Sequence, residues 1–193
     1  MKKLGSILWI ASAIFIFSGC KGNKGSTSTA DSANLSKTQD TTQLKQHIAV
    51  DQNDAKFAVT AAADGMAEVA AGKMAVTKAV STRIKNFATM MVNDHSKVGN
   101  ELAKIARDKD ITLPTAPDTT AKKKAAELSQ KSGKAFDKAY VDAMVDGHKK
   151  AVSLFEDGSK NLKDTTLRAF AIKTLPTLKM HLDSINAIKK SMK

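Results

Sequence analysis

The sequence predicts an all-α protein built as an up-down-up-down four-helix bundle. From about Ala49 onward the chain is rich in Ala and Lys, holds only three prolines and shows no strand-like alternation. Four long stretches carry apolar residues at helical spacing, and short polar segments separate them. A three-helix bundle with a long C-terminal arm is the alternative architecture.

The helices are expected in a definite order. The first runs from about residue 54 to 79, and the second starts at Ser81 or Thr82 and ends near residue 110. Two prolines place a loop over 111–119, and a short basic helix over 120–131 completes the crossover. A third long helix fits 134–157. The fourth begins at 164 or 165, is interrupted or kinked at Pro176, and continues to the C-terminus.

Residues 1–20 are predicted to be a signal peptide. Two lysines precede an apolar run over 4–17, which is too short to span a membrane. The chain's single cysteine, Cys20, follows Phe17-Ser18-Gly19 and resembles the lipidated cysteine of bacterial lipoprotein precursors. We therefore expect export, with a lipid on Cys20 that anchors the protein to a membrane leaflet of the bacterial envelope; an ordinary secretory signal is the alternative.

Residues 21–46 are expected to form a flexible tether, because this stretch is rich in Ser, Thr, Lys, Asn and Gly and holds only four apolar residues. The helical domain then covers residues 47–193. This domain carries most of the chain's formal net charge of +12, which would favour binding to an anionic envelope polymer or to an envelope protein. The run Lys122–Lys124 is the candidate surface for that binding. Solvated lysine-rich helix faces explain the charge as well. Nucleic acid is excluded as a partner, because no binding motif is present and aromatic residues are few.

Four residues are predicted to meet inside the bundle. His95, His148 and His181 each lie in the apolar stripe of a different helix, and Glu68 lies in the middle of a small-residue face on the first helix. Glu68 and His95 are equally far from the turn near residue 81, and His148 and His181 from the turn near residue 164. If both turns lie at one end, the two pairs stand roughly 20 and 25 Å from it, a mismatch of about one helical turn.

Three imidazoles and a carboxylate in an apolar interior would suit a divalent transition metal. Neighbouring acids could orient these ligands, and two methionines four residues before a histidine would favour copper. These accessory candidates are Asp64, Met91, Asp94, Met144 and Asp146. A metal-free network of Glu–His hydrogen bonds would satisfy the buried Glu68 equally well, so both interpretations stay open.

Several chemistries lack their motifs. A carboxylate-bridged di-iron centre needs Glu-x-x-His pairs, and no Glu here has a His three residues later. The chain also has no nucleophile elbow, no free catalytic Cys and no Gly-rich phosphate loop. An enzymatic role would require a metal with an open coordination position, and no substrate pocket can be read from the chain.

An ordered set of motifs resembles a known family. It comprises Met90-Met91-Val92-Asn93-Asp94-His95-Ser96-Lys97, then Phe136-Asp137 with Tyr140, then Asp146-Gly147-His148, then Thr174-Leu175-Pro176-Thr177-Leu178 with His181-Leu182. Together they resemble the bacterial domain-of-unknown-function family 4142 over roughly residues 51–187. The resemblance implies an exported or lipid-anchored protein with a ferritin-like helical bundle. It implies no established activity.

Overall fold

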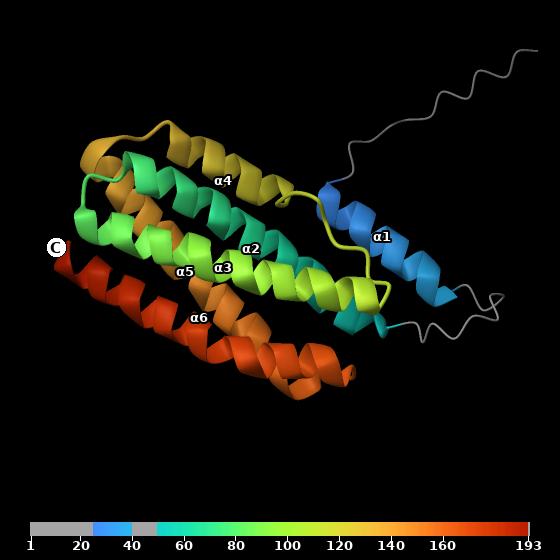
Figure 1. Cartoon of the computed structure of the whole chain (residues 1–193). Coiled ribbons are helices and arrows are strands. Elements are labelled where there is room, and N and C mark those ends of the chain that lie inside the picture. The colour runs from blue at the N-terminus through green and yellow to red at the C-terminus, as the bar shows by residue number, and fades with distance from the viewer. Residues whose placement is uncertain (1–24, 40–49, 193) are drawn as a thin grey trace, which may run out of the picture.

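The structure is a computed structural model that describes residues 25–39 and 50–192 (Figure 1). These residues form six α-helices and no strand, which confirms the all-α prediction. The helices are α1 (Ser26–Gln39), α2 (Gln52–Lys78), α3 (Thr82–Asp108), α4 (Thr119–Ser129), α5 (Gly133–Asn161) and α6 (Thr165–Ser191). The predicted signal peptide, Cys20 and the remainder of the predicted tether lie outside the described residues.

The four long helices α2, α3, α5 and α6 pack side by side (Figure 1). α2 with α3 and α5 with α6 form two helical hairpins, which join through contacts of α2 with α5 and of α3 with α6. The shorter α4 packs on α2 and α5, and α1 packs on α2. Each long helix buries one stripe, as the helical spacing of its apolar residues predicts.

The expected up-down-up-down topology is wrong. Asp137, at the start of α5, accepts hydrogen bonds from the backbone N–H groups of Val80 and Ser81 in the α2–α3 turn, both at 3.0 Å. Asp54, at the start of α2, accepts hydrogen bonds from the backbone N–H groups that follow α5, at 3.1 and 2.6 Å. The two hairpin turns therefore lie at opposite ends, and α5 runs parallel to α3. The physical reason is α4, which carries the chain back along the molecule before α5 begins (Figure 1).

The helix α1 corrects the expectation that the whole of residues 21–46 is an unstructured tether. Ala30 and Asn34 on this helix are buried. The Asn34 side chain donates a hydrogen bond to the carbonyl of Thr112 (2.9 Å) and accepts one from its N–H (2.7 Å). Lys37 also pairs with Asp110 at 2.8 Å. Because polar contacts hold α1 in place, hydropathy gave no sign of it.

Pro176 does not interrupt α6, as the sequence had suggested it could. The helix continues from Thr165 to Ser191 with the proline inside it. Proline removes the hydrogen bond to the carbonyl of Ile172, four residues earlier. Ile172 lies on the exposed side of α6, where water can satisfy that carbonyl.

Two apolar clusters fill the interior at successive heights. The first surrounds the α2–α3 turn and includes Phe87, Phe136 and Ile185; the second surrounds the α5–α6 turn and includes Phe57 and Phe170. α5 extends to Asn161 instead of ending near residue 157. This last part of the helix includes Gly158. Glycine is needed there, because a Cβ would stand 2.8 Å from the Phe57 ring.

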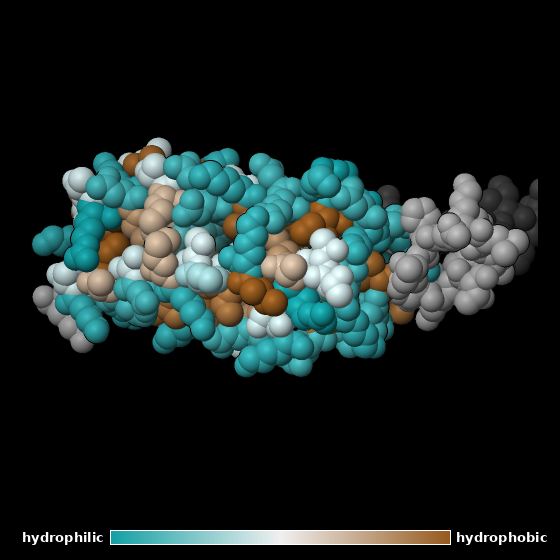
Figure 2. All heavy atoms as spheres, turned by 60° about the horizontal axis from the view of Figure 1, so that its bottom comes forward, coloured by the Kyte–Doolittle hydropathy of each residue, from teal (hydrophilic) through white to brown (hydrophobic). Residues whose placement is uncertain are grey.

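The face that comes forward in Figure 2 is mostly hydrophilic, with hydrophobic atoms scattered among polar ones. No helix among the described residues combines the length and apolar character that crossing a membrane requires.

Candidate metal centre

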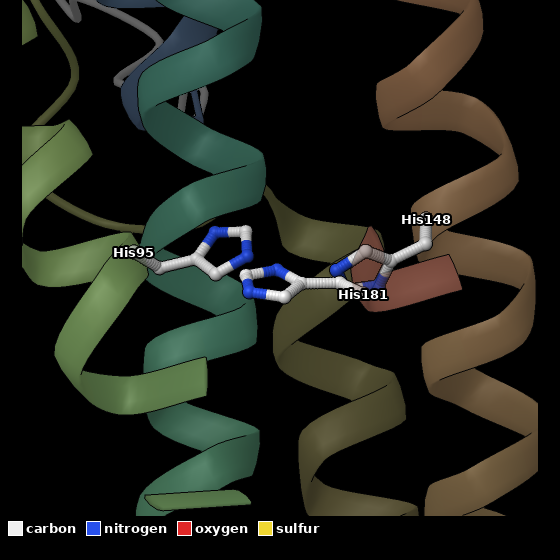
Figure 3. Close-up of side chains that lie close together, drawn as sticks. All are labelled: His95, His148 and His181. Atoms are coloured by element: carbon white, nitrogen blue, oxygen red, sulfur yellow. The ribbon is translucent and has the colours of Figure 1, made fainter. Parts of the chain in front are cut away.

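Four polar side chains from four different helices meet between the two apolar clusters. Glu68 comes from α2, His95 from α3, His148 from α5 and His181 from α6. Glu68 and His95 are each 6% exposed, and the other two histidines are 0% exposed. Figure 3 shows the three imidazole rings pointing toward one another. The structure thus brings together the four residues that the sequence singled out.

The Glu68 carboxylate bridges two of the rings. Its Oε2 atom lies 3.0 Å from Nδ1 of His95, and its Oε1 atom lies 3.4 Å from Nδ1 of His148. Gly147 makes room for this carboxylate, because a Cβ at that position would stand 3.1 Å from Oε1. The carboxylate therefore lies on the Nδ1 side of both rings.

Two of the histidines also have one nitrogen in a defined hydrogen bond. Nδ1 of His148 lies 3.0 Å from the backbone carbonyl of Met144, and Nε2 of His181 lies 3.1 Å from Oδ2 of Asp94. A carbonyl only accepts, so Nδ1 of His148 donates, and the Asp94 carboxylate likewise accepts from Nε2 of His181. Nδ1 of His95 faces the Glu68 carboxyl group and donates to it when Glu68 is ionised, as a neighbouring cation would make it.

The opposite nitrogen of each ring has no hydrogen-bond partner among the described residues. These buried atoms are Nε2 of His95, Nε2 of His148 and Nδ1 of His181. With the other nitrogen donating to a carbonyl or to an ionised carboxylate, each neutral ring presents a lone pair at its unpartnered atom. One nitrogen of each ring lies within 4.8 Å of one nitrogen of the other two. Three lone pairs without donors thus converge in the interior.

The spacing of these atoms suits a metal ion. If all three stood 4.8 Å apart, a point at their centre would lie about 2.8 Å from each, against about 2.0–2.1 Å in a zinc–imidazole bond. Each ring would have to move inward by less than about 1 Å to reach bonding distance.

Burial keeps the cluster uncharged without an ion. Desolvation, and then the neighbouring His148 and His181, lower the pKa of His95 to about 3. Desolvation lowers the pKa of His148 to about 4 and also lowers that of His181. Desolvation, with a smaller contribution from Asp64, raises the pKa of Glu68 to about 8. All three histidines are neutral at pH 7, as metal ligands must be.

The accessory residues that the sequence proposed have different positions. Asp94 contacts His181 directly, whereas Met144 contacts the cluster through its backbone carbonyl. Met91 and Met144 belong to the apolar cluster around the α2–α3 turn. Asp64 is half-buried one turn before Glu68. Asp146 lines a surface cavity beside α4.

Sequence reasoning did not identify two residues of this region. The buried Tyr140 hydroxyl has no hydrogen-bond partner among the described residues, and desolvation together with Glu68 raises its pKa. Its spacing of eight residues from His148 places it on the same face of α5 and could have identified it. Gly147 gave no comparable signal, because its role depends on where the Glu68 carboxylate lies.

Two surface cavities reach Glu68 from different sides. One, of about 510 Å3, lies between α2 and α3 and is also lined by His95. The other, of about 380 Å3, lies between α2, α4 and α5 and is lined by Met144 and Gly147 but by none of the three histidines.

Comparison with known proteins gives one family. The search of curated proteins found no match, and the search of solved structures found none either. A family model matches residues 35–188, which is most of the chain and includes all four residues of the cluster. The chain belongs to the family described as Domain of unknown function (DUF4142).

Proposed function

We propose that this protein binds one divalent transition-metal ion through His95, His148 and His181. One observation carries the proposal: three buried imidazole rings bring one nitrogen each to within 4.8 Å of one another, and each ring has a buried nitrogen without a hydrogen-bond partner among the described residues. An unpartnered buried polar atom is costly, and three at one point need a common partner. A cation that accepts three lone pairs meets that need.

The surrounding carboxylates would support such an ion. Glu68 faces Nδ1 of His95 and His148, and Asp94 faces Nε2 of His181. Carboxylates in these positions orient ligating rings and increase their basicity. Two carboxylates also balance two positive charges, which favours a divalent ion over copper(I). Glu68 would thereby act on the ligands instead of binding the metal itself.

A metal-free hydrogen-bond network accounts for the cluster less well. It explains the nitrogens that face Glu68, Asp94 and the Met144 carbonyl. It leaves one buried nitrogen of each ring without a hydrogen-bond partner in the part of the chain that the structure describes. The donor set of neutral imidazoles suits zinc, copper, iron or nickel. Three protein ligands leave a further coordination position open, as in metal sites that bind an exogenous molecule.

Metal content is the direct test. The chain from Lys21 to Lys193, which includes α1, is purified without a histidine tag, incubated with zinc, copper, iron or manganese, and desalted for elemental analysis. We expect one ion per chain in the wild type and none in His148→Ala. His148→Gln repeats the test with a side chain of similar size, and circular dichroism checks that both variants fold.

The matched control is His47→Ala, since His47 is the chain's remaining histidine and is not one of the three proposed ligands. This variant is expected to retain one ion. Protein that stays metal-free after every incubation would contradict the proposal, and so would a His148→Gln variant that is folded and still binds one ion.

We further propose that the protein is exported and anchored to a membrane of the bacterial envelope through a lipid on Cys20. The support is the short basic and apolar leader and the position of the chain's single cysteine. Expression of the full chain in bacteria fed a labelled fatty acid should label the wild type. Cys20→Ser should remove both the label and the protein from the membrane fraction. An unlabelled wild type would contradict the anchor.

A basic surface supports a second role as an envelope interaction module. Lys122, Lys123 and Lys124 are exposed on α4 and form no ion pair with any described residue. Such a run attracts anionic polymers through long-range charge, and salt screens that attraction. Binding to anionic cell-wall polymer should weaken steeply with salt and should be lost when the three lysines are replaced by Gln. Binding that ignores both changes would contradict this role.

A further inference from the structure

The cavity between α2 and α3 leads from the surface to the histidine cluster. Most of its lining is apolar and comes from α2, α3, α5 and α6, and its polar part comprises Asp64, Glu68, Lys73, His95, Ser96 and Asn100. His95 is only 6% exposed, and its Nε2 atom has no hydrogen-bond partner among the described residues. The cavity is therefore in contact with one of the three convergent rings.

Two glycines line this cavity. Gly65 on α2 and Gly99 on α3 both line it, and a Cβ at either position would meet nothing within 4 Å. Both lie inside long helices, where glycine costs roughly 1 kcal/mol relative to alanine. Neither close packing nor a left-handed backbone explains them.

Gly72 shows the contrast on the same pair of helices. A Cβ there would stand 2.9 Å from a Val92 methyl carbon, so Gly72 allows α2 and α3 to approach closely. The two helices thus pack tightly at Gly72 and leave space at Gly65 and Gly99. The space lies at the height of Glu68 and His95.

The second cavity differs in its lining. It reaches Glu68 and Gly147, but none of the three histidines lines it, and charged side chains such as Asp118, Lys124 and Asp146 surround it. Of the two cavities, only the one between α2 and α3 touches a prospective metal ligand.

We infer that the α2–α3 cavity is the binding site of a small molecule that occupies the open coordination position beside His95, His148 and His181. The inference rests on the proposed metal site. Three imidazoles leave one position without a protein donor. The apolar walls and the two carboxylates already facing the ligand rings favour a small, weakly hydrated nitrogen or oxygen donor with no charge or one negative charge.

The test uses protein loaded with cobalt(II), whose visible absorption reports its ligands, and sodium azide as the probe. In the wild type, azide should change the spectrum in a saturable way. Gly99→Leu and Gly65→Leu place a side chain in the cavity, and leucine is a good helix former, so both should fold. We expect each to bind one cobalt ion and to weaken azide binding at least tenfold.

Ala143→Leu is the matched control, because Ala143 lines the other cavity. This variant should bind azide as the wild type does. Cobalt bound with no azide response would overturn the inference and leave the metal site standing. Equal azide binding by the Gly99→Leu and Gly65→Leu variants, or its loss in Ala143→Leu, would also overturn it. Protein that takes up no cobalt, zinc or copper would overturn both the metal site and this inference.

Discussion

Glu68 is the residue that connects two of the three prospective ligands. Its carboxylate oxygens stand 3.0 and 3.4 Å from Nδ1 of His95 and His148. A carboxylate can accept from both rings, whereas an amide has one acceptor oxygen and presents N–H to the other ring. The charge and geometry of Glu68 should therefore matter even if it does not touch the metal.

We predict that Glu68→Gln weakens metal binding about 10- to 100-fold without changing the stoichiometry of one ion, because loss of such an orienting carboxylate has effects of this size. Competition with a chelator of known affinity measures the change. Asp64→Asn, one turn earlier on the same face of α2, is the control and should change affinity far less. An unchanged affinity in Glu68→Gln would show that the carboxylate has no part in the site.

The stability of the metal-free protein should be highest near pH 6.5. Below that pH the three histidines take up protons in the unfolded chain but not in the folded one, because burial lowers their folded pKa values, to about 3 for His95 and about 4 for His148. Stability is then lost as the pH falls from 6.5 toward 4. Glu68 acts oppositely: its folded pKa is raised to about 8, so its contribution is lost as pH rises from about 4.5 to 8.

Each group that binds a proton in only one of the two states, folded or unfolded, changes the free energy of unfolding by up to about 1.4 kcal/mol per pH unit. Below pH 6.5 three histidines outweigh one glutamate, so the net slope is a loss toward acid. Urea unfolding of metal-free protein at a series of pH values measures this. His148→Gln should flatten the acid limb. A stability that stays constant between about pH 6.5 and 4.5 would contradict the buried neutral cluster.

At this scale the sequence predicted which side chains meet but not how they meet. Helical spacing placed Glu68 and the three histidines on inward faces, and also placed Asp94 beside His95. Which carboxylate oxygen faces which ring nitrogen depends on side-chain torsions. The sequence therefore suggested Glu68 as a metal ligand, whereas the structure places its carboxylate on the Nδ1 side of His95 and His148.

Among the elements, each helical hairpin is held by a buried aspartate from the other. Asp137 of α5 accepts two backbone hydrogen bonds from the α2–α3 turn, and Asp54 of α2 accepts two from the turn after α5. Both aspartates are buried. They fix the relative position of the hairpins at both ends of the molecule.

We predict that Asp137→Asn lowers the free energy of unfolding by about 2–3 kcal/mol, because the amide can satisfy one turn N–H and opposes the other. Urea unfolding of the metal-free protein measures the loss. Asp142→Asn, on the same helix but at the surface with Lys138 and Lys189, should cost less than about 1 kcal/mol. Equal effects of the two substitutions would show that the buried turn contact adds nothing beyond a surface ion pair.

Helices with apolar stripes were the most predictable elements. The expected α2 and α3 differ from the structure by only a residue or two at each end. The sequence did not predict α1, because this helix has no apolar stripe and contacts the rest of the protein through polar side chains such as Asn34 and Lys37. α5 continues past the expected end near residue 157, because Gly158 stays in the helix and its lack of a side chain allows Phe57 to approach.

For the whole molecule, the predicted chain direction was wrong and the meeting of the four residues was still correct. The expectation placed both hairpin turns at one end, whereas Asp54 and Asp137 show that they lie at opposite ends. Glu68, His95, His148 and His181 all lie in the middle third of their helices. Residues near mid-length meet whichever way each helix runs, so reversing one hairpin does not separate them.

A metal ion that binds only the folded protein should stabilise the molecule as a whole. We predict that zinc at about 100 times its dissociation constant raises the free energy of unfolding by roughly 2.7 kcal/mol, and that the thermal midpoint continues to rise with zinc concentration. Differential scanning calorimetry measures the shift. The midpoint of His148→Gln should not respond, whereas that of His47→Ala should respond like the wild type. Equal shifts in all three proteins would indicate nonspecific binding.

The ligand set can be measured directly by X-ray absorption spectroscopy of the zinc-loaded protein. We predict three imidazole nitrogens at about 2.0–2.1 Å from the zinc ion, with one further light-atom ligand from outside the chain. A first shell that contains a methionine sulfur, or fewer than three imidazoles, would contradict a site built from His95, His148 and His181.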